Sequence, residues 1–181
     1  MVFGDLAITE ASGRSGAFGG LELGSATELL VPALPGAAFE LDAVTHSGTS
    51  TFVAQAHDVL PGTRAHPQVL EGPAILAPPH GATGATLETE LSFTAVEGAV
   101  YYVLAYDSGN PDGVTYYVAT SEPFARLPDA SALGISFPTD REFRWEAHTE
   151  HGHASLDAYA SGERSTGWGY SETRSFTTEG P

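Results

Sequence analysis

The sequence predicts an all-β protein made of two tandem β-sandwich domains. Apolar residues in its most regular segments recur at every second position, the period of a half-buried strand, and helical periodicity is weak. Turn formers separate these short segments, and the chain has 21 glycines and 12 prolines. Short strands at close spacing with such turns are typical of β-sandwiches.

Five strands are predicted in the second half of the chain, where segments either alternate or form runs of β-branched and aromatic residues. They cover residues 86–95, 99–106, 114–119, 142–149 and 171–178. In the fourth of these, Phe143, Trp145 and Ala147 share the face that we expect to be buried. The second and third are joined by DSGNPDG, which is almost entirely turn formers, so we expect a hairpin with a long loop.

The first half contains similar short units at residues 5–9, 21–23, 28–31, 38–46 and 49–57. We interpret the glycine-rich GAFGG (16–20) as a structural turn. The uncharged segment GPAILAPPHGATG (72–84) is the best linker, so we place the boundary near Ala77, with domains at 1–76 and 77–181. The first domain is small for a sandwich without cysteines, and we expect it to lean on the second or to be atypical.

The charge of the chain argues against two classes of partner. The 23 acidic residues outnumber the seven basic ones, all of which are arginine, and the formal net charge is −16. Such a surface repels nucleic acids and anionic lipids, whose binding depends on neutralised phosphates. We therefore expect no nucleic-acid partner, and without a long apolar run we expect no membrane insertion. The lysine-free acidic composition is typical both of salt adaptation and of genomic base bias.

The chain has no cysteine, which excludes disulfides, thiolate nucleophiles and thiolate metal sites. Its start, MVFGDLAITE, has neither the basic region nor the apolar region of a signal peptide. Two interpretations follow: the protein stays inside the cell, or Met1 stands where a native leader was removed.

Residues 78–178 resemble a fibronectin type III domain of the kind common in bacterial surface and secreted proteins. The matching motifs are APP, EGAVYYVLAY, LPDASALGISFPTDREFRWEAHT and GWGYSETRSFTT. Phe143 stands where the family usually has a tyrosine, so the family's hydroxyl-to-backbone bond lacks its donor there, and the loop 150–169 is long. AFELDAVTH in the first half resembles the same strand of a second copy. The resemblance implies a non-catalytic spacer, scaffold or binding module at the cell surface or outside the cell.

Three of the seven histidines lie in AHTEHGH, and they are candidate metal ligands. His148 faces away from the buried side of its strand, and His151 and His153 lie at the strand end or in the next loop. H-x-H on an extended strand suits zinc or copper, with Glu150 or Asp157 as an added oxygen ligand. The competing interpretation is a solvated strand end. We expect the imidazoles to splay, because a metal site needs a converged ligand shell.

No other motif indicates a metal site or catalysis. The loop 107–113 imitates the start of a calcium-binding loop, but Ala119 stands where that loop has its glutamate ligand, so we predict a β-turn. The chain has no nucleophile elbow, metalloprotease motif, phosphate loop or dinucleotide fingerprint. We therefore predict that the protein is not an enzyme.

Aromatic residues cluster in the second domain and form the candidate contact surface. Neighbours along a strand point to opposite faces, so one tyrosine of each YY pair faces outward. Outward rings would stack on sugars or fill a protein pocket, and cross-strand packing beneath the long loop is the alternative interpretation. The candidate partner-binding residues are Tyr102, Tyr117, Tyr159, Trp168 and Tyr170.

These observations together predict a structural, adhesive or spacer module that binds a protein partner or another copy of itself. Two alternatives stay open. One is a carbohydrate- or metal-binding accessory module; the other is a filament or capsid subunit whose short first domain is completed by a neighbour's strand. We expect no cofactor, except zinc or copper if His148, His151 and His153 converge.

Overall fold

The computed structural model describes residues 2–9, 15–22, 38–47, 50–60, 63, 72–110 and 112–180. In this part of the chain the regular structure is almost entirely β-strand, and the helices are short. The strands form two sheets, which confirms the predicted all-β class. None of the described helices has the length and apolarity that crossing a membrane requires.

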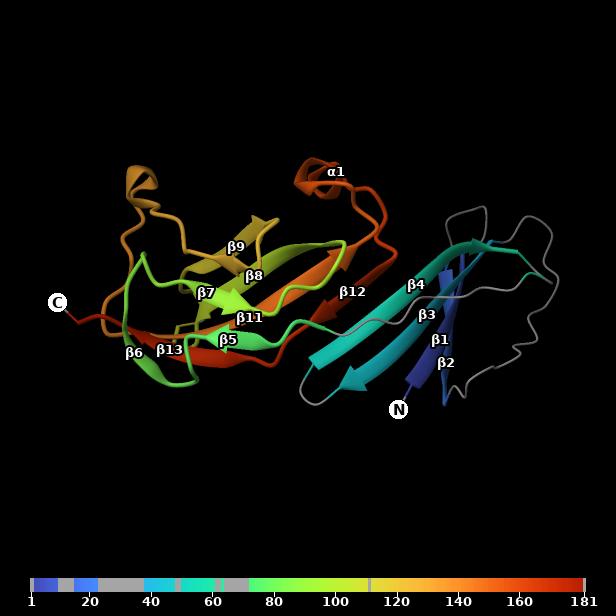
Figure 1. Cartoon of the computed structure of the whole chain (residues 1–181), viewed down its shortest axis with the longest axis horizontal. Helices are drawn as coiled ribbons and strands as arrows, with labels where there is room; N and C mark the ends of the chain where they lie inside the picture. The colour runs from blue at the N-terminus through green and yellow to red at the C-terminus, as the bar shows by residue number, and fades with distance from the viewer. Residues whose placement is uncertain are drawn as a thin grey trace.

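The larger sheet begins with four antiparallel strands from the first half of the chain. β3 (Ala38–Ser47) and β4 (Ser50–Val59) form a hairpin, and β1 (Val2–Thr9) pairs with β3. β2 (Ser15–Glu22) pairs with β1 and ends this side of the sheet. Figure 1 shows these strands in blue and teal.

The same sheet continues with strands from the second half of the chain. These are β6 (Ala82–Ala85), β8 (Ala99–Asp107), β9 (Thr115–Thr120), β11 (Glu142–His151), β12 (Gly167–Tyr170) and β13 (Arg174–Thr178). β11 pairs with β8 on one side and with β12 and then β13 on the other. β9 pairs with β8, and β6 runs parallel to β13.

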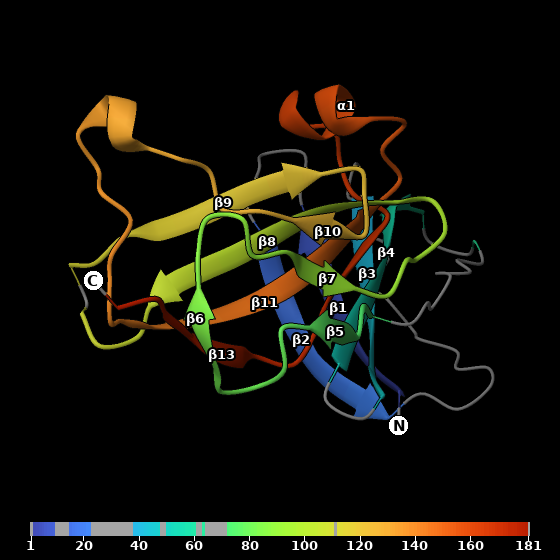
Figure 2. The same ribbon diagram turned by 60° about the vertical axis from the view of Figure 1, so that its left-hand side comes forward.

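The smaller sheet has three short strands in the order β10 (Phe124–Ala125), β7 (Leu91–Phe93) and β5 (Ile75–Ala77). Figure 2 shows it lying over β8 and β11 of the larger sheet. The connecting segments carry the 3-10 helix η1 (Ser131–Leu133) and the helix α1 (Leu156–Ala160). The two packed sheets give the chain a β-sandwich-like fold.

One sheet crosses the predicted domain boundary near Ala77. β4 pairs antiparallel with β12, with Thr51 opposite Tyr170. Beyond this pairing the Gln55 amide donates to the carbonyl of Thr166 at 2.8 Å. The strands of the first half therefore extend the sheet of the second half, as Figure 1 shows for β4 beside β12.

Several predicted strands agree closely with the observed ones, because their alternation is regular. β8, β9 and β11 lie at Ala99–Asp107, Thr115–Thr120 and Glu142–His151, against predictions of 99–106, 114–119 and 142–149. In the second half of the chain, the first predicted strand covers residues 86–95, but the observed strand β7 covers only Leu91–Phe93. The Thr89 amide donates to the Thr86 carbonyl at 3.0 Å and closes a turn before that strand.

The glycine-rich residues 16–20 require a correction. We predicted a turn, but these residues lie within β2. β2 pairs with β1 along most of its length, and this ladder holds the glycines in an extended conformation that glycine does not itself favour. The predicted strand 28–31 lies outside the described residues.

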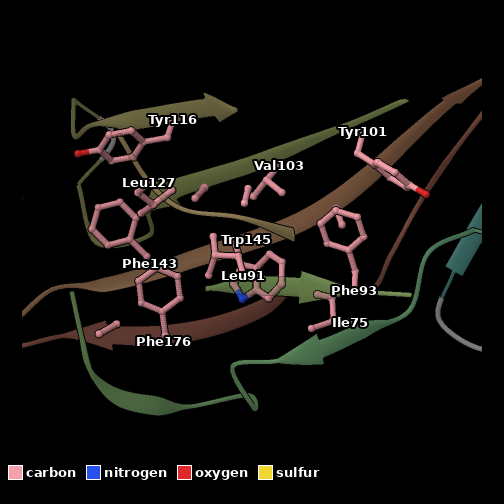
Figure 3. Close-up of a cluster of buried hydrophobic side chains, with 14 residues drawn as sticks. Ile75, Leu91, Phe93, Tyr101, Val103, Tyr116, Leu127, Phe143, Trp145 and Phe176 are labelled. Atoms are coloured by element: carbon pink, nitrogen blue, oxygen red, sulfur yellow. The ribbon is translucent and has the colours of Figure 1, made fainter. Parts of the chain in front are cut away.

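The main core lies between the two sheets, and all its members fall between residues 75 and 176. Phe143 and Trp145 of β11 have no exposed surface, and Phe93 of the smaller sheet is buried near them (Figure 3). Phe143 stacks on Phe176 of β13 with 5.7 Å between ring centroids. The alternation read from 142–149 thus correctly identifies the buried face of β11.

Candidate functional site

The outward face of the larger sheet carries a row of aromatic side chains, which we call the aromatic face. It is opposite to the face that packs on the smaller sheet, since each outward residue alternates with a buried one along its strand. Its members are Tyr102 of β8, Tyr117 of β9, His148 of β11, Tyr159 of α1, and Trp168 and Tyr170 of β12.

Strand register places these side chains next to one another. His148 lies opposite Tyr102 on one side and opposite Tyr170 on the other. Trp168 lies two residues before Tyr170 and therefore on the same face. Tyr117 lies opposite Leu104, one pleat from Tyr102, and is 72% exposed.

Ring contacts join most of these residues into one continuous row. Tyr102 and His148 are stacked, with 4.2 Å between ring centroids and 15° between planes. Tyr170 lies 5.8 Å from His148, and Trp168 lies 5.9 Å from Tyr170. At the other end Tyr159 of α1 lies 6.4 Å from Tyr102, with nearly parallel planes. The row therefore runs from α1 across β8 and β11 to β12.

The structure places all five sequence-predicted contact residues on this face. The pleat divides each YY pair: Tyr101 and Tyr116 are buried in the core, while Tyr102 and Tyr117 face outward. Sequence analysis missed His148 as a member of the row, because it treated this residue only as a metal ligand. The alternation of buried and exposed positions along β11 places His148 on the outward side, and this pattern would have indicated its membership of the row.

Two glutamates of β11, Glu146 and Glu150, share the outward parity of His148. Glu146 accepts hydrogen bonds from His148 Nε2 at 2.9 Å and from Thr173 Oγ1 at 3.2 Å. The bond from His148, above all, lowers the pKa of Glu146. Burial raises the pKa of Glu150, and this outweighs the opposing effects of a hydrogen bond from Ser165 and of nearby histidine charge.

The phenol hydroxyls of Tyr102 and Tyr159 stay protonated at neutral pH. Burial, and then the negative charge of Glu150, raise the pKa of Tyr102 to about 12. The same two causes raise the pKa of Tyr159. Both side chains are therefore neutral hydrogen-bonding groups beside a carboxylate, and both lie close to Glu150.

The sequence GWGY of β12 explains why one strand serves two surfaces. Its aromatic residues face outward, and its glycines face the other side, where a Cβ on Gly167 or Gly169 would lie 2.9 Å from the Phe52 ring. Phe52 of β4 is 2% exposed and contacts His151 edge-on at 5.4 Å. The glycines thus leave the space into which the first half of the chain docks.

The structure does not bring His148, His151 and His153 together. His148 faces outward, whereas His151 faces inward, is buried and contacts Phe52. His153 lies past the strand end and packs edge-on against Tyr159 at 5.3 Å. Burial, and then His153, lower the pKa of His151. Within the described residues no group of three or more histidines and carboxylates has the arrangement of a metal site.

The loop 107–113 is held by its own polar side chains. Asp107 Oδ1 accepts from the Gly109 amide at 3.0 Å, and Asn110 Oδ1 accepts from the Asp112 amide at 3.2 Å. The carboxylate of Asp107 also lies 3.6 Å from Arg141 Nε. These are the contacts of a turn built from turn formers.

A hollow of about 460 Å³ lies beside the row, between the start of β8 and the segment leading into α1. His153 lines it together with residues 98–100, 121 and 154–157. Sequence analysis gave no signal for this hollow, because its walls come from segments that are far apart in the chain.

The described residues thus assemble an extended aromatic surface flanked by carboxylates. They do not assemble the three clustered histidines into one ligand set. No family model, curated protein or solved structure matches the chain.

Proposed function

We propose that the chain is a non-enzymatic adhesive or structural module that binds a protein partner through the aromatic face. The observation that carries this proposal is the continuous row of rings from Tyr159 to Trp168, each partly exposed and none of them in the core cluster. Tyrosine and tryptophan give a large contact area at low entropic cost and dominate the energetic centres of protein interfaces.

The ring geometry favours a protein partner over a carbohydrate. Sugar binding by aromatic residues depends on an open ring face, but Tyr102 and His148 cover each other at 4.2 Å. These two central residues therefore offer ring edges and polar atoms to a partner. A mixed surface of ring edges, hydroxyl groups and carboxylates is typical of protein interfaces.

We further propose that residues 77–181 form a fibronectin type III-like domain and that residues 1–76 form a smaller β-domain appended to it. The sequence motifs of 78–178 support the first assignment, and so does the packing of β7 and β10 on a sheet that contains β8, β9, β11 and β13. β5, which packs with them, begins two residues before the predicted boundary. Such domains act as spacers and binding modules of surface and secreted proteins. A location at the cell surface or outside the cell is therefore part of the proposal.

A peptide selection tests the binding role directly. Random peptides displayed on phage are selected on the whole chain, and the enriched peptides are titrated into isotope-labelled protein. We expect the chemical-shift changes to map to the aromatic face. Tyr102→Ala and Trp168→Ala should each weaken the best peptide at least about tenfold, because truncating an anchor residue at the centre of an interface costs about 2 kcal/mol or more, and about 1.4 kcal/mol is tenfold.

The matched control is Leu133→Ala, which removes an apolar side chain that is 80% exposed and lies on η1, away from the row. It should leave peptide affinity unchanged. Peptides that map elsewhere, or that bind both ring variants as tightly as the wild type, would refute the proposal. A glycan array and light scattering at rising concentration report the rival outcomes of sugar binding and self-association.

A further inference from the structure

Glu150 is a carboxylate on the aromatic face without an arginine partner among the described residues. Glu146, on the same strand, is already engaged by His148 and Thr173. Four of the described arginines pair with other carboxylates, namely Arg126 with Glu90, Arg141 with Asp107, Arg164 with Asp58 and Arg174 with Glu172. Arg144 is exposed near the opposite end of β11.

Three aromatic side chains from three elements lie near Glu150 on the aromatic face. Trp168 of β12 is its cross-strand neighbour and shares its face. Tyr102 of β8 lies opposite His148, one pleat along from Glu150 on the same face, and Tyr159 of α1 lies 6.4 Å from Tyr102. The charge of Glu150 acts on both hydroxyl groups. The carboxylate is only partly exposed, and among the described residues it pairs with no arginine, although His148, His153 and Ser165 lie close enough to act on it.

A partly desolvated carboxylate among aromatic rings has the chemistry of a cation site. A cation gains from the negative charge of the carboxylate, from the tyrosine hydroxyl oxygens and from any ring face that no neighbouring ring covers, and each contribution grows where water is partly excluded. Arginine fits such a site better than lysine. Its planar guanidinium stacks on rings, pairs with both oxygens of a carboxylate and is more weakly hydrated.

We propose that Glu150, Tyr102, Tyr159 and Trp168 form a subsite that takes an arginine side chain of the protein partner. This inference rests on the proposed function and specifies the partner as a segment that carries an accessible arginine. The net charge of −16 supports it, since a strongly acidic protein attracts basic segments over long range.

The test uses the whole chain, labelled with ¹⁵N, and three capped tripeptides. These are acetyl-Gly-Arg-Gly-amide, its citrulline analogue and its lysine analogue. Citrulline has nearly the shape of arginine without the charge. We expect the arginine peptide to shift the resonances of Tyr102, Glu150, Tyr159 and the Trp168 indole, and to bind at least fivefold more tightly than the citrulline peptide. The affinity of the lysine peptide should lie between those of the arginine and citrulline peptides.

Two charge-neutralising variants separate a specific site from general attraction. Glu150→Gln should weaken the arginine peptide at least fivefold, whereas Glu179→Gln should leave it unchanged. Glu179 is exposed and follows β13 at the far end of the sheet, where Glu142 pairs with Thr177. The inference is overturned if the arginine and citrulline peptides bind with equal affinity or if both variants lose the same affinity for the arginine peptide. It is also overturned if the arginine peptide causes no saturable chemical-shift changes.

The peptide selection described above distinguishes failure of this inference from failure of the proposed function. If only the arginine subsite is wrong, selected peptides still map to the aromatic face and bind Glu150→Gln as tightly as the wild type. If the proposed function is wrong, no selected peptide maps to that face.

Discussion

At the scale of single residues, two adjacent tyrosines of β8 have different roles. Tyr102 belongs to the aromatic face, whereas Tyr101 is 3% exposed and packs on Phe93. The Tyr101 hydroxyl donates to the Val96 carbonyl at 2.9 Å and accepts from the Val96 amide at 2.8 Å. It therefore ties the strand to the turn before it. Phe143, where a hydroxyl-to-backbone bond was in question, instead lies wholly within the core.

Tyr101→Phe should lower the free energy of unfolding by about 1–3 kcal/mol, because it leaves the Val96 amide without its acceptor and leaves the Val96 carbonyl with the Ala99 amide as its donor. Chemical denaturation of the variant and the wild type measures this difference. Tyr117→Phe is the matched control, since the Tyr117 side chain is 72% exposed and its hydroxyl is open to water. Equal losses in the two variants would contradict the role assigned to the Tyr101 hydroxyl.

Glu150→Gln should raise the melting temperature at pH 7. Burial raises the pKa of Glu150 in the folded state above its ordinary value, so the ionised side chain destabilises the fold at any pH above that raised pKa. This cost shrinks as the pH falls through the folded-state pKa and vanishes below the ordinary value of about 4.3. The increase in melting temperature caused by Glu150→Gln should therefore be present at pH 7–8 and absent near pH 4.

Calorimetry of the wild type, Glu150→Gln and Glu179→Gln between pH 4 and 8 checks this expectation. Among the described residues, the titratable groups that act on Glu150 or are acted on by it are His148, His153, Tyr102 and Tyr159, and all of them are retained in the variant. A Glu150→Gln chain that melts lower than the wild type at pH 7 would show that the carboxylate stabilises the fold.

At the scale of elements, β12 is the strand on which both surfaces of the sheet depend. Its even positions, Trp168 and Tyr170, supply one end of the aromatic face. Its odd positions, Gly167 and Gly169, leave room for Phe52 of β4. A larger residue at either glycine would meet both this ring and the backbone of β4, so the two glycines determine whether the first half of the chain docks.

Gly169→Ala should destabilise the docking of β4 by about 1–3 kcal/mol, the typical cost of overpacking. The added Cβ would lie 2.9 Å from Phe52 Cδ2 and 3.0 Å from the Thr51 carbonyl oxygen. Hydrogen exchange should accelerate in β3 and β4 and remain slow in β8. Gly109→Ala is the control, because its Cβ would meet Asp107 Oδ1 at 3.6 Å, an ordinary contact. Unchanged exchange in β4 of the Gly169 variant would count against this account.

At the scale of the whole molecule, the residues whose side chains the structure describes contribute unequally to the hydrophobic core in the two halves of the chain. The main cluster lies entirely between residues 75 and 176. The cluster contributed by the first half, as far as its side chains are described, consists of Ala43, Phe52 and Ala54. The backbone ladder of β4 with β12 and the His57 Nε2–H bond to the Ser165 carbonyl, at 2.6 Å, connect the halves.

Separate expression of residues 72–181 and 1–71 tests this division. We expect 72–181 to unfold cooperatively, with near-ultraviolet circular dichroism from the packed Trp145, because it retains the whole main core. Residues 1–71 alone should lack a cooperative transition, since isolated sheets without a sufficient core are marginal in water. Mixing the fragments should restore dispersed amide resonances. A well-dispersed spectrum from 1–71 alone would instead indicate an independently stable domain.

Part of the candidate site was predictable from local pattern. The alternation of β11 placed Trp145 inward and His148 outward before any contact was known, and the YY pairs indicated that one tyrosine of each faces outward. The row itself was not predictable, because Tyr159 reaches Tyr102 only through the course of the loop after β11. Likewise the lack of a described arginine partner for Glu150 depends on where the fold places each arginine.

The sequence by itself determined the all-β class, the main strands of the second half and the face to which each of their side chains points. These follow from a period of two, which is a property of neighbouring residues. The tertiary structure decided that β4 adds to β12, that Phe52 lies against Gly167 and Gly169, and that Tyr159 of α1 lies beside Tyr102. Register between strands that are distant in the chain depends on many cross-strand contacts together, and a local sequence pattern does not specify these contacts.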